Sequence, residues 1–130
     1  MIDLTVIGLN DRDMELINGL TLLGLPRREA TLMIYLSGVT EATSKEIERA
    51  TLLRQPEVSM GMRFLRVNGW VNEREVEVDG NGRPYKVYSL RTTLQEIVSR
   101  YEAQRLEKST RSMEAIQKLK ELRYAKAGKE

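Results

Sequence analysis

Residues 43–70 read TSKEIERATLLRQPEVSMGMRFLRVNGW, and this stretch decides the fold. Thr43 and Glu46 form a capping box, in which each side chain bonds the other residue's backbone N–H, so a short helix is predicted over residues 44–50. A turn follows. Gln55-Pro56 then begins a second helix, because a proline near a helix start lacks only an N–H that has no helical partner there. Asn68-Gly69 ends it.

The next residues change from helical spacing to a period of two. In residues 73–78 (EREVEV) the valines stand at every second position, and residues 85–90 (YKVYSL) alternate again. Between them, residues 79–84 (DGNGRP) are dense in turn formers. Two alternating runs around such a turn predict a β-hairpin. Trp70 precedes it and is expected to fill the core beneath the hairpin, with a ligand pocket as the alternative.

Two further helices are predicted before this unit. Asn10 or Asp11 caps the first, and Gly24 ends it. Pro26 opens the second, which runs to about Ser37 and is apolar on two faces, so we expect it at the centre of the fold. Gly61, inside the helix that begins at Gln55, costs about 1 kcal/mol relative to alanine. Close contact between helices is the expected reason, and closeness to a ligand such as DNA is the alternative.

A second capping box at Thr93-Leu-Gln-Glu96 predicts a final helix to about Tyr124. Its first two turns are expected to pack on the preceding domain, whereas a lone helix beyond them is marginal in water. Pairing with a second copy is therefore predicted, through the apolar residues Leu106, Met113, Ile116, Leu119 and Leu122. Polar residues interrupt the heptad, so no long regular zipper is expected. The alternative is a frayed, basic tail.

These elements predict a mainly α protein with a small β-hairpin (α+β), a winged helix-turn-helix with a long C-terminal helix. Residues 1–92 form the winged domain, with an extra N-terminal helix, and residues 93–130 form the dimerisation helix. In this fold the second helix of the pair enters the DNA major groove, about 12 Å wide. The expected contacts to double-stranded DNA are Ser44, Arg54, Gln55, Pro56, Ser59, Arg63 and Arg66, with Arg74, Arg83 and Lys86 on the hairpin.

Charge gives only partial support to this interpretation. Net charge is +2; residues 1–53 carry 5 basic and 8 acidic side chains, and residues 91–130 carry 10 and 6. The hairpin also holds Glu73, Glu75, Glu77 and Asp79, which repel phosphate unless they face away. Exposed arginines on a helix are, moreover, often only solvated.

Composition narrows the other classes of function. The chain has no cysteine and no histidine, so disulfides, thiol nucleophiles and the usual zinc or copper ligands are excluded. No nucleophile–base pair or phosphate loop is present, so we expect no enzyme and no cofactor. The apolar runs are too short to span a bilayer, and the start Met1-Ile-Asp-Leu4 is unlike a signal peptide, so a cytoplasmic protein is expected.

Four segments resemble predicted archaeal winged-helix transcriptional regulators of the wide group that contains the MarR, ArsR and TrmB families: SKEIERA (44–50), LRQPEVS (53–59), NGWV (68–71) and GRPYKVY (82–88). The match covers about residues 24–92. It implies a dimeric, sequence-specific DNA binder, with the helix from Gln55 as reader and residues 80–83 as the wing tip. The chain lacks the Cys and His ligands of the metal-sensing ArsR proteins and the large sugar-binding domain of the long TrmB proteins, so no effector is implied.

A second hypothesis belongs to another class: a winged-helix interaction module that docks on the transcription machinery and never reads bases. The hairpin acids and the low net charge favour it. Binding to DNA that weakens steeply with salt distinguishes the first hypothesis from the second.

Overall fold

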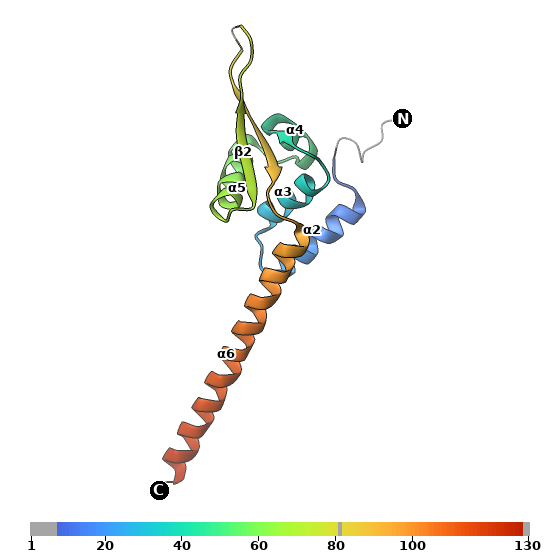
Figure 1. The fold of residues 1–130 in the computed structure, drawn as a ribbon. Helices are drawn as coiled ribbons and strands as arrows, with labels where there is room; N and C mark the ends of the chain where they lie inside the picture. The colour runs from blue at the N-terminus through green and yellow to red at the C-terminus, as the bar shows by residue number, and fades with distance from the viewer. Residues whose placement is uncertain (1–7, 81, 129–130) are drawn as a thin grey trace.

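A winged domain and a long projecting helix make up the molecule (Figure 1). The computed structural model describes residues 8–80 and 82–128. Its elements are α2 (Asp11–Leu23), α3 (Arg27–Ser37), β1 (Ala42–Thr43), α4 (Ser44–Thr51), α5 (Gln55–Val67), β2 (Val71–Val76), β3 (Tyr85–Leu90) and α6 (Leu94–Gly128). The hairpin of β2 and β3 and the free end of α6 point to opposite ends of the molecule. The expected winged helix-turn-helix, mainly helical with a small sheet, is confirmed.

The predicted helix ends are found with the expected hydrogen bonds. Asn10 caps α2 and exchanges bonds with Asp13, and Thr43 caps α4 and exchanges bonds with Glu46. At α6, the Glu96 N–H donates to Thr93 Oγ1 as predicted, but the Glu96 carboxylate accepts from the Thr92 hydroxyl. This box is therefore only half formed, because the neighbouring threonine takes the carboxylate.

The sheet has three antiparallel strands in the order β1-β3-β2. β2 and β3 form the predicted hairpin, with Val71 opposite Leu90 and Val76 opposite Tyr85. β1 was not predicted. It has only two residues, pairing Ala42 with Tyr88, and it ties the start of α4 to the base of the hairpin.

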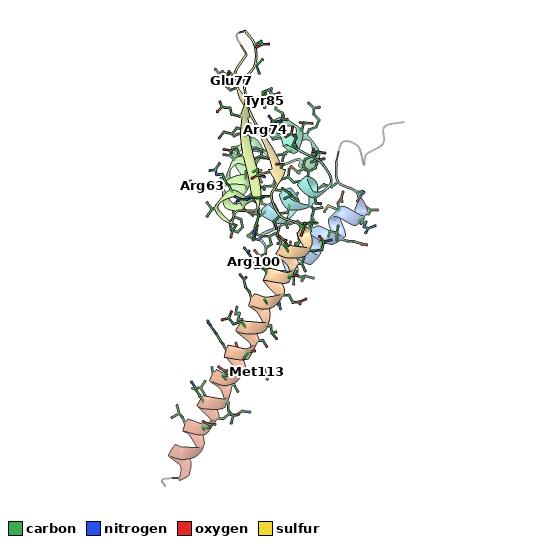
Figure 2. All side chains as sticks on the ribbon, in the orientation of Figure 1. Arg63, Arg74, Glu77, Tyr85, Arg100 and Met113 are labelled. Carbon is green, nitrogen blue, oxygen red and sulfur yellow. The ribbon has the colours of Figure 1, made fainter. Side chains whose placement is uncertain are left out.

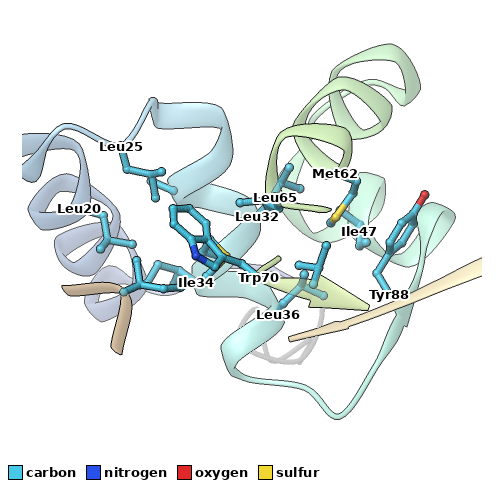
Figure 3. Close-up of a cluster of buried hydrophobic side chains, with 14 of the residues drawn as sticks. Leu20, Leu25, Leu32, Ile34, Leu36, Ile47, Met62, Leu65, Trp70 and Tyr88 are labelled. Atoms are coloured by element: carbon cyan, nitrogen blue, oxygen red, sulfur yellow. The ribbon is translucent and has the colours of Figure 1, made fainter. Parts of the chain in front are cut away.

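Helix α3 lies at the centre of the core, as its two apolar faces predicted, and packs against α2, α4, α5 and β3. Leu32, Met33 and Leu36 of α3 are fully buried. Trp70 is 5% exposed and lies at the centre of the apolar cluster in Figure 3, with its ring centroid 6.3 Å from that of Phe64 and 6.1 Å from that of Tyr101. The core role predicted for Trp70 is confirmed.

Gly61 allows the close approach of two helices. A Cβ built on Gly61 would overlap Leu32 Cδ1, which belongs to a fully buried side chain of α3. The contact between helices, rather than a contact with DNA, therefore explains the glycine.

The N-terminal turns of α6 pack on the winged domain, and the rest of α6 projects beyond it (Figure 1). Ile97 is buried, Leu94 and Tyr101 are partly buried, and Arg105 Nη1 donates a 2.8 Å hydrogen bond to the Leu22 carbonyl at the end of α2. Beyond this point the apolar side chains are 53–69% exposed: Leu106, Met113, Ile116, Leu119 and Leu122. The segment Met1–Leu4, on which the expected absence of a signal peptide rests, lies outside the described residues.

Candidate nucleic-acid interface

One face of α5 is buried and the opposite face lies open. Val58, Met62 and Leu65 point into the core, as predicted. The open face carries Gln55, Pro56, Ser59 and Arg63, all exposed. Figure 2 shows Arg63 directed away from the body of the domain. The face therefore combines side chains that hydrogen-bond base edges or phosphates with a free approach from solvent.

Two apolar residues on the same open side were not predicted. Met60 is 58% exposed and Val67 is 78% exposed, and they flank Arg63 along the helix. The sequence contains one indication of this, because neither position falls on the helical spacing of the buried residues Val58, Met62 and Leu65. Apolar side chains in a major groove contact the methyl group of thymine, so Met60 extends the candidate reading surface.

The turn before α5 fixes the direction of the helix. Leu52 has φ 63°, a left-handed conformation that is uncommon for a residue with a side chain, and its N–H donates to the Glu48 carbonyl at 2.9 Å. The Arg54 N–H donates to Glu57 Oε1 at 3.2 Å, which closes the first turn of α5. Arg54, predicted as a DNA contact, lies exposed at this N-cap.

A charged cluster connects α5 with the hairpin. Arg66 Nη1 lies 2.9 Å from Glu73 Oε1, and Lys86 Nζ lies 3.8 Å from the same oxygen. Burial raises the pKa of the neighbouring Tyr88 hydroxyl, the Glu73 carboxylate raises it further, and a hydrogen bond with Ser44 lowers it. Arg66 of α5 thus pairs with Glu73 of β2, and Lys86 of β3 approaches the same carboxylate. These two cations, both predicted as DNA contacts, neutralise one of the four hairpin acids.

The remaining predicted hairpin residues differ in their surroundings. Arg74 forms two hydrogen bonds with the Glu41 carboxylate, at 2.6 and 3.2 Å, which raise the pKa of its guanidinium. Arg83 is exposed near the tip of the hairpin. Glu75 lies opposite Lys86 in the strand register, and Glu77 and Asp79 are exposed further out. Exposed ion pairs contribute little to stability because water and salt screen them, so phosphate can displace Glu41 from Arg74 at small cost.

The structure brings the predicted residues together in two groups. Gln55, Pro56, Ser59 and Arg63 share the open face of α5, with Arg54 at its start, whereas Arg83 is distant at the hairpin tip. Ser44 is half-buried at the first turn of α4, beside Tyr88. Within the described part of the chain, no group of three or more metal-binding side chains is found, and no helix is long and apolar enough to cross a membrane.

Comparison with known proteins adds likenesses at the level of fold. No protein-family model matches the chain, and no curated protein matches it. Among solved structures, Stf76 from the Sulfolobus islandicus plasmid-virus pSSVx is 19% identical over 56% of this chain and 92% of its own, with a TM-score of 0.45. A transcriptional regulator homologue from Pyrococcus horikoshii OT3 is 23% identical over 78% of this chain and 97% of its own, with a TM-score of 0.49. Likenesses of this size assign neither a family nor an activity, and the fold assignment rests on the elements described above.

Proposed function

We propose that this protein is a transcriptional regulator that binds double-stranded DNA in a sequence-specific manner. In this proposal α5 enters the major groove, and the hairpin is the wing that touches the minor groove or the adjacent phosphates. The protein belongs to the archaeal winged-helix group that its sequence resembles, acts in the cytoplasm and catalyses no reaction. The small likenesses to solved structures are consistent with this proposal and do not carry it.

The observation that carries the proposal is the open face of α5. The helix is held by buried Val58, Met62 and Leu65 on one side, so its orientation is set by the core. Arg63 lies near the middle of the open side, where a guanidinium can form paired hydrogen bonds with guanine. Gln55, at the first turn, can pair in the same way with adenine. A rigid reader with two such side chains selects a few base pairs.

A single reader is weak, and the exposed half of α6 supports a homodimer. One recognition helix sees few base pairs, and two helices about one DNA turn apart (34–36 Å) read a palindrome with useful selectivity. Five large apolar side chains from Leu106 to Leu122 are more than half exposed on α6. We propose that a second copy covers part of them, with residues 1–92 as the DNA-binding unit and residues 93–130 as the dimerisation unit.

Selection of bound fragments from the native genome tests the sequence-specific part of the proposal. Purified protein is mixed with sheared genomic DNA, and the retained fragments are sequenced. We expect enrichment of a short palindromic motif. Retention without any enriched motif would show DNA binding without base reading and would contradict the proposal.

A second candidate function is an interaction module that docks on a protein of the transcription machinery. Glu75, Glu77 and Asp79, exposed on the wing, favour it, because they oppose the approach of phosphate. Exposed Met60 and Val67 would then form part of an apolar docking face. Absence of binding to any duplex at low salt would favour this function.

A further inference from the structure

One seam runs along α6 from the winged domain to the distal turns. Starting at Leu94, steps of four and three residues alternate without a break, which is the heptad spacing of a helix–helix contact. The seam consists of Leu94, Val98, Tyr101, Arg105, Lys108, Ser112, Ala115, Leu119 and Leu122. Both ends of it are apolar and its middle is polar, so the pattern reads nearly the same in either direction.

The proximal end of this seam borders two hollows. One, of about 610 Å³, lies where the end of α2 meets α6, and its lining includes Leu23, Gly24, Tyr101 and Lys108. The other, of about 260 Å³, lies between α2 and the start of α6, with Leu16, Leu20, Leu94 and Val98 in its wall. The described residues 8–80 and 82–128 leave both spaces open.

The distal end of the seam carries the side chains that fit such spaces. Leu119 is 66% exposed and Leu122 is 68% exposed, and the α6 segment around them projects beyond the winged domain. Removing exposed leucine side chains from water stabilises an assembly, so covering these residues is strongly favoured. Leu119 and Leu122 could therefore fill the hollows, but within one chain they lie too far along α6 to contact α2.

We propose that a second copy of the chain closes this seam, with the two α6 helices antiparallel and their two-fold axis level with Thr110. This inference rests on the homodimer of the proposed function and specifies its geometry. Val98 then lies against the partner's Leu122, and Tyr101 against the partner's Leu119. The distal leucines of each copy enter the hollows beside α2 of the other.

Charge decides between this arrangement and a parallel one. In a parallel pair each seam residue meets its own copy, so Arg105 faces the partner's Arg105 and Lys108 faces the partner's Lys108. Four cations then meet in two adjacent layers, and like charges across a helix pair are repulsive. In the antiparallel register Arg105 meets the partner's Ala115, and Lys108 meets the partner's Ser112. The polar middle then holds no like-charged pair, and its small residues let the helices approach.

The antiparallel register also places the two winged domains at opposite ends of the paired helices. Ile97, by which α6 is anchored in its own domain, lies level with residue 123 of the partner helix. A rise of 1.5 Å per residue over these 26 residues separates the two anchor points by about 39 Å.

Disulfide trapping tests the register, and the absence of cysteine from the chain makes every introduced thiol informative. The variant Val98→Cys/Leu122→Cys is oxidised and run on a non-reducing gel, with each single variant as control. We expect a covalent dimer from the double variant only. A second double variant, Lys108→Cys/Ser112→Cys, repeats the test near the two-fold axis. Both positions are exposed, so these substitutions do not disturb folding.

Leu119→Cys alone distinguishes the two directions. In the antiparallel register the two thiols lie 18 residues apart along the rod, about 27 Å, so no disulfide forms. Efficient cross-linking of this single variant, together with cross-linking of the single control variants, would overturn the antiparallel register and leave the proposed regulator intact. A monomer by light scattering would overturn the inference and the homodimer together. DNA binding, measured on the same samples, tests the proposed function separately.

Discussion

Gly61 shows how a single missing methyl group sets the position of α5. The residue is buried inside α5, directly against the tip of Leu32 in α3. Because Leu32 is fully enclosed by the core, it has little room to move. The distance between α3 and α5, and therefore how far α5 projects from the domain, depends on this contact.

Gly61→Ala is therefore expected to destabilise the protein despite the better helix propensity of alanine. Overpacking costs about 1–3 kcal/mol, and alanine returns up to about 1 kcal/mol, so a net loss of up to about 2 kcal/mol in the free energy of unfolding is predicted. Chemical denaturation measures it. In the background of Leu32→Ala the same substitution should cost much less, since the overlapping atoms are gone. Equal costs in both backgrounds would show that the contact is not the reason for the glycine.

Arg63 and Arg83 are expected to act differently although both are exposed arginines. Arg63→Ala and Gln55→Ala should weaken binding to the selected site by about 1–3 kcal/mol more than binding to random DNA, because they remove contacts with bases. Arg83→Ala should weaken both about equally, because it removes a phosphate contact. Titrations of the two duplexes measure this. Arg12→Ala, an exposed arginine on α2, is the matched control and should change neither.

Equal losses on selected and random DNA for Gln55→Ala, Arg63→Ala and Arg83→Ala would show that α5 is not the reading helix. The sequence could not separate Arg63 from Arg66, three residues later, because both follow the exposed spacing. Only the fold brings Glu73, seven residues beyond Arg66, within 2.9 Å of its guanidinium.

At the scale of elements, the wing is attached to α5 through Glu73. This carboxylate holds Arg66 from α5 and Lys86 from β3, so it keeps two cations of the candidate interface occupied. The same acid looked unfavourable for DNA binding in the sequence. In the structure Arg66 and Lys86 compensate the charge of Glu73. Glu73 therefore opposes phosphate binding mainly because it keeps these two cations paired.

Glu73→Gln should raise the affinity for random DNA at low salt and make its salt dependence steeper. Release of one cation to phosphate adds about 0.9 to the slope of log K against log salt. Fluorescence anisotropy at several salt concentrations measures both quantities. Glu107→Gln is the matched control, because it frees Arg111 in the same way on α6, far from the wing. A fall in affinity for Glu73→Gln alone would show that the ion pairs are needed to hold the wing in place.

Most elements were predictable because their signals are local. The capping residues Asn10 and Thr43 and the alternating runs of the hairpin each mark a boundary within a few residues. β1 was not predictable, since two residues carry no periodicity and its pairing with β3 joins Ala42 to Tyr88 across the chain. The ion pair of Arg74 with Glu41 could not be predicted for the same reason, because 33 residues separate its partners.

At the scale of the whole molecule, the wing and the open face of α5 belong to a compact head, and α6 is a rod that leaves it (Figure 1). The sequence predicted the rod and its exposed apolar residues. It did not show the hollows beside α2, because these depend on how α2 and α6 pack together. In the proposed dimer, the rod would set the spacing of two heads, and each head would supply one reading helix.

The proposed function requires that the open face of α5 and the wing meet the phosphates and bases of a duplex. The most direct test is a titration of a mixed-sequence duplex from about 50 to about 200 mM salt. We predict binding at the lowest salt and a linear fall of log K with log salt, with a slope of about −0.9 for each phosphate contacted. A duplex left unbound at the lowest salt would contradict the account.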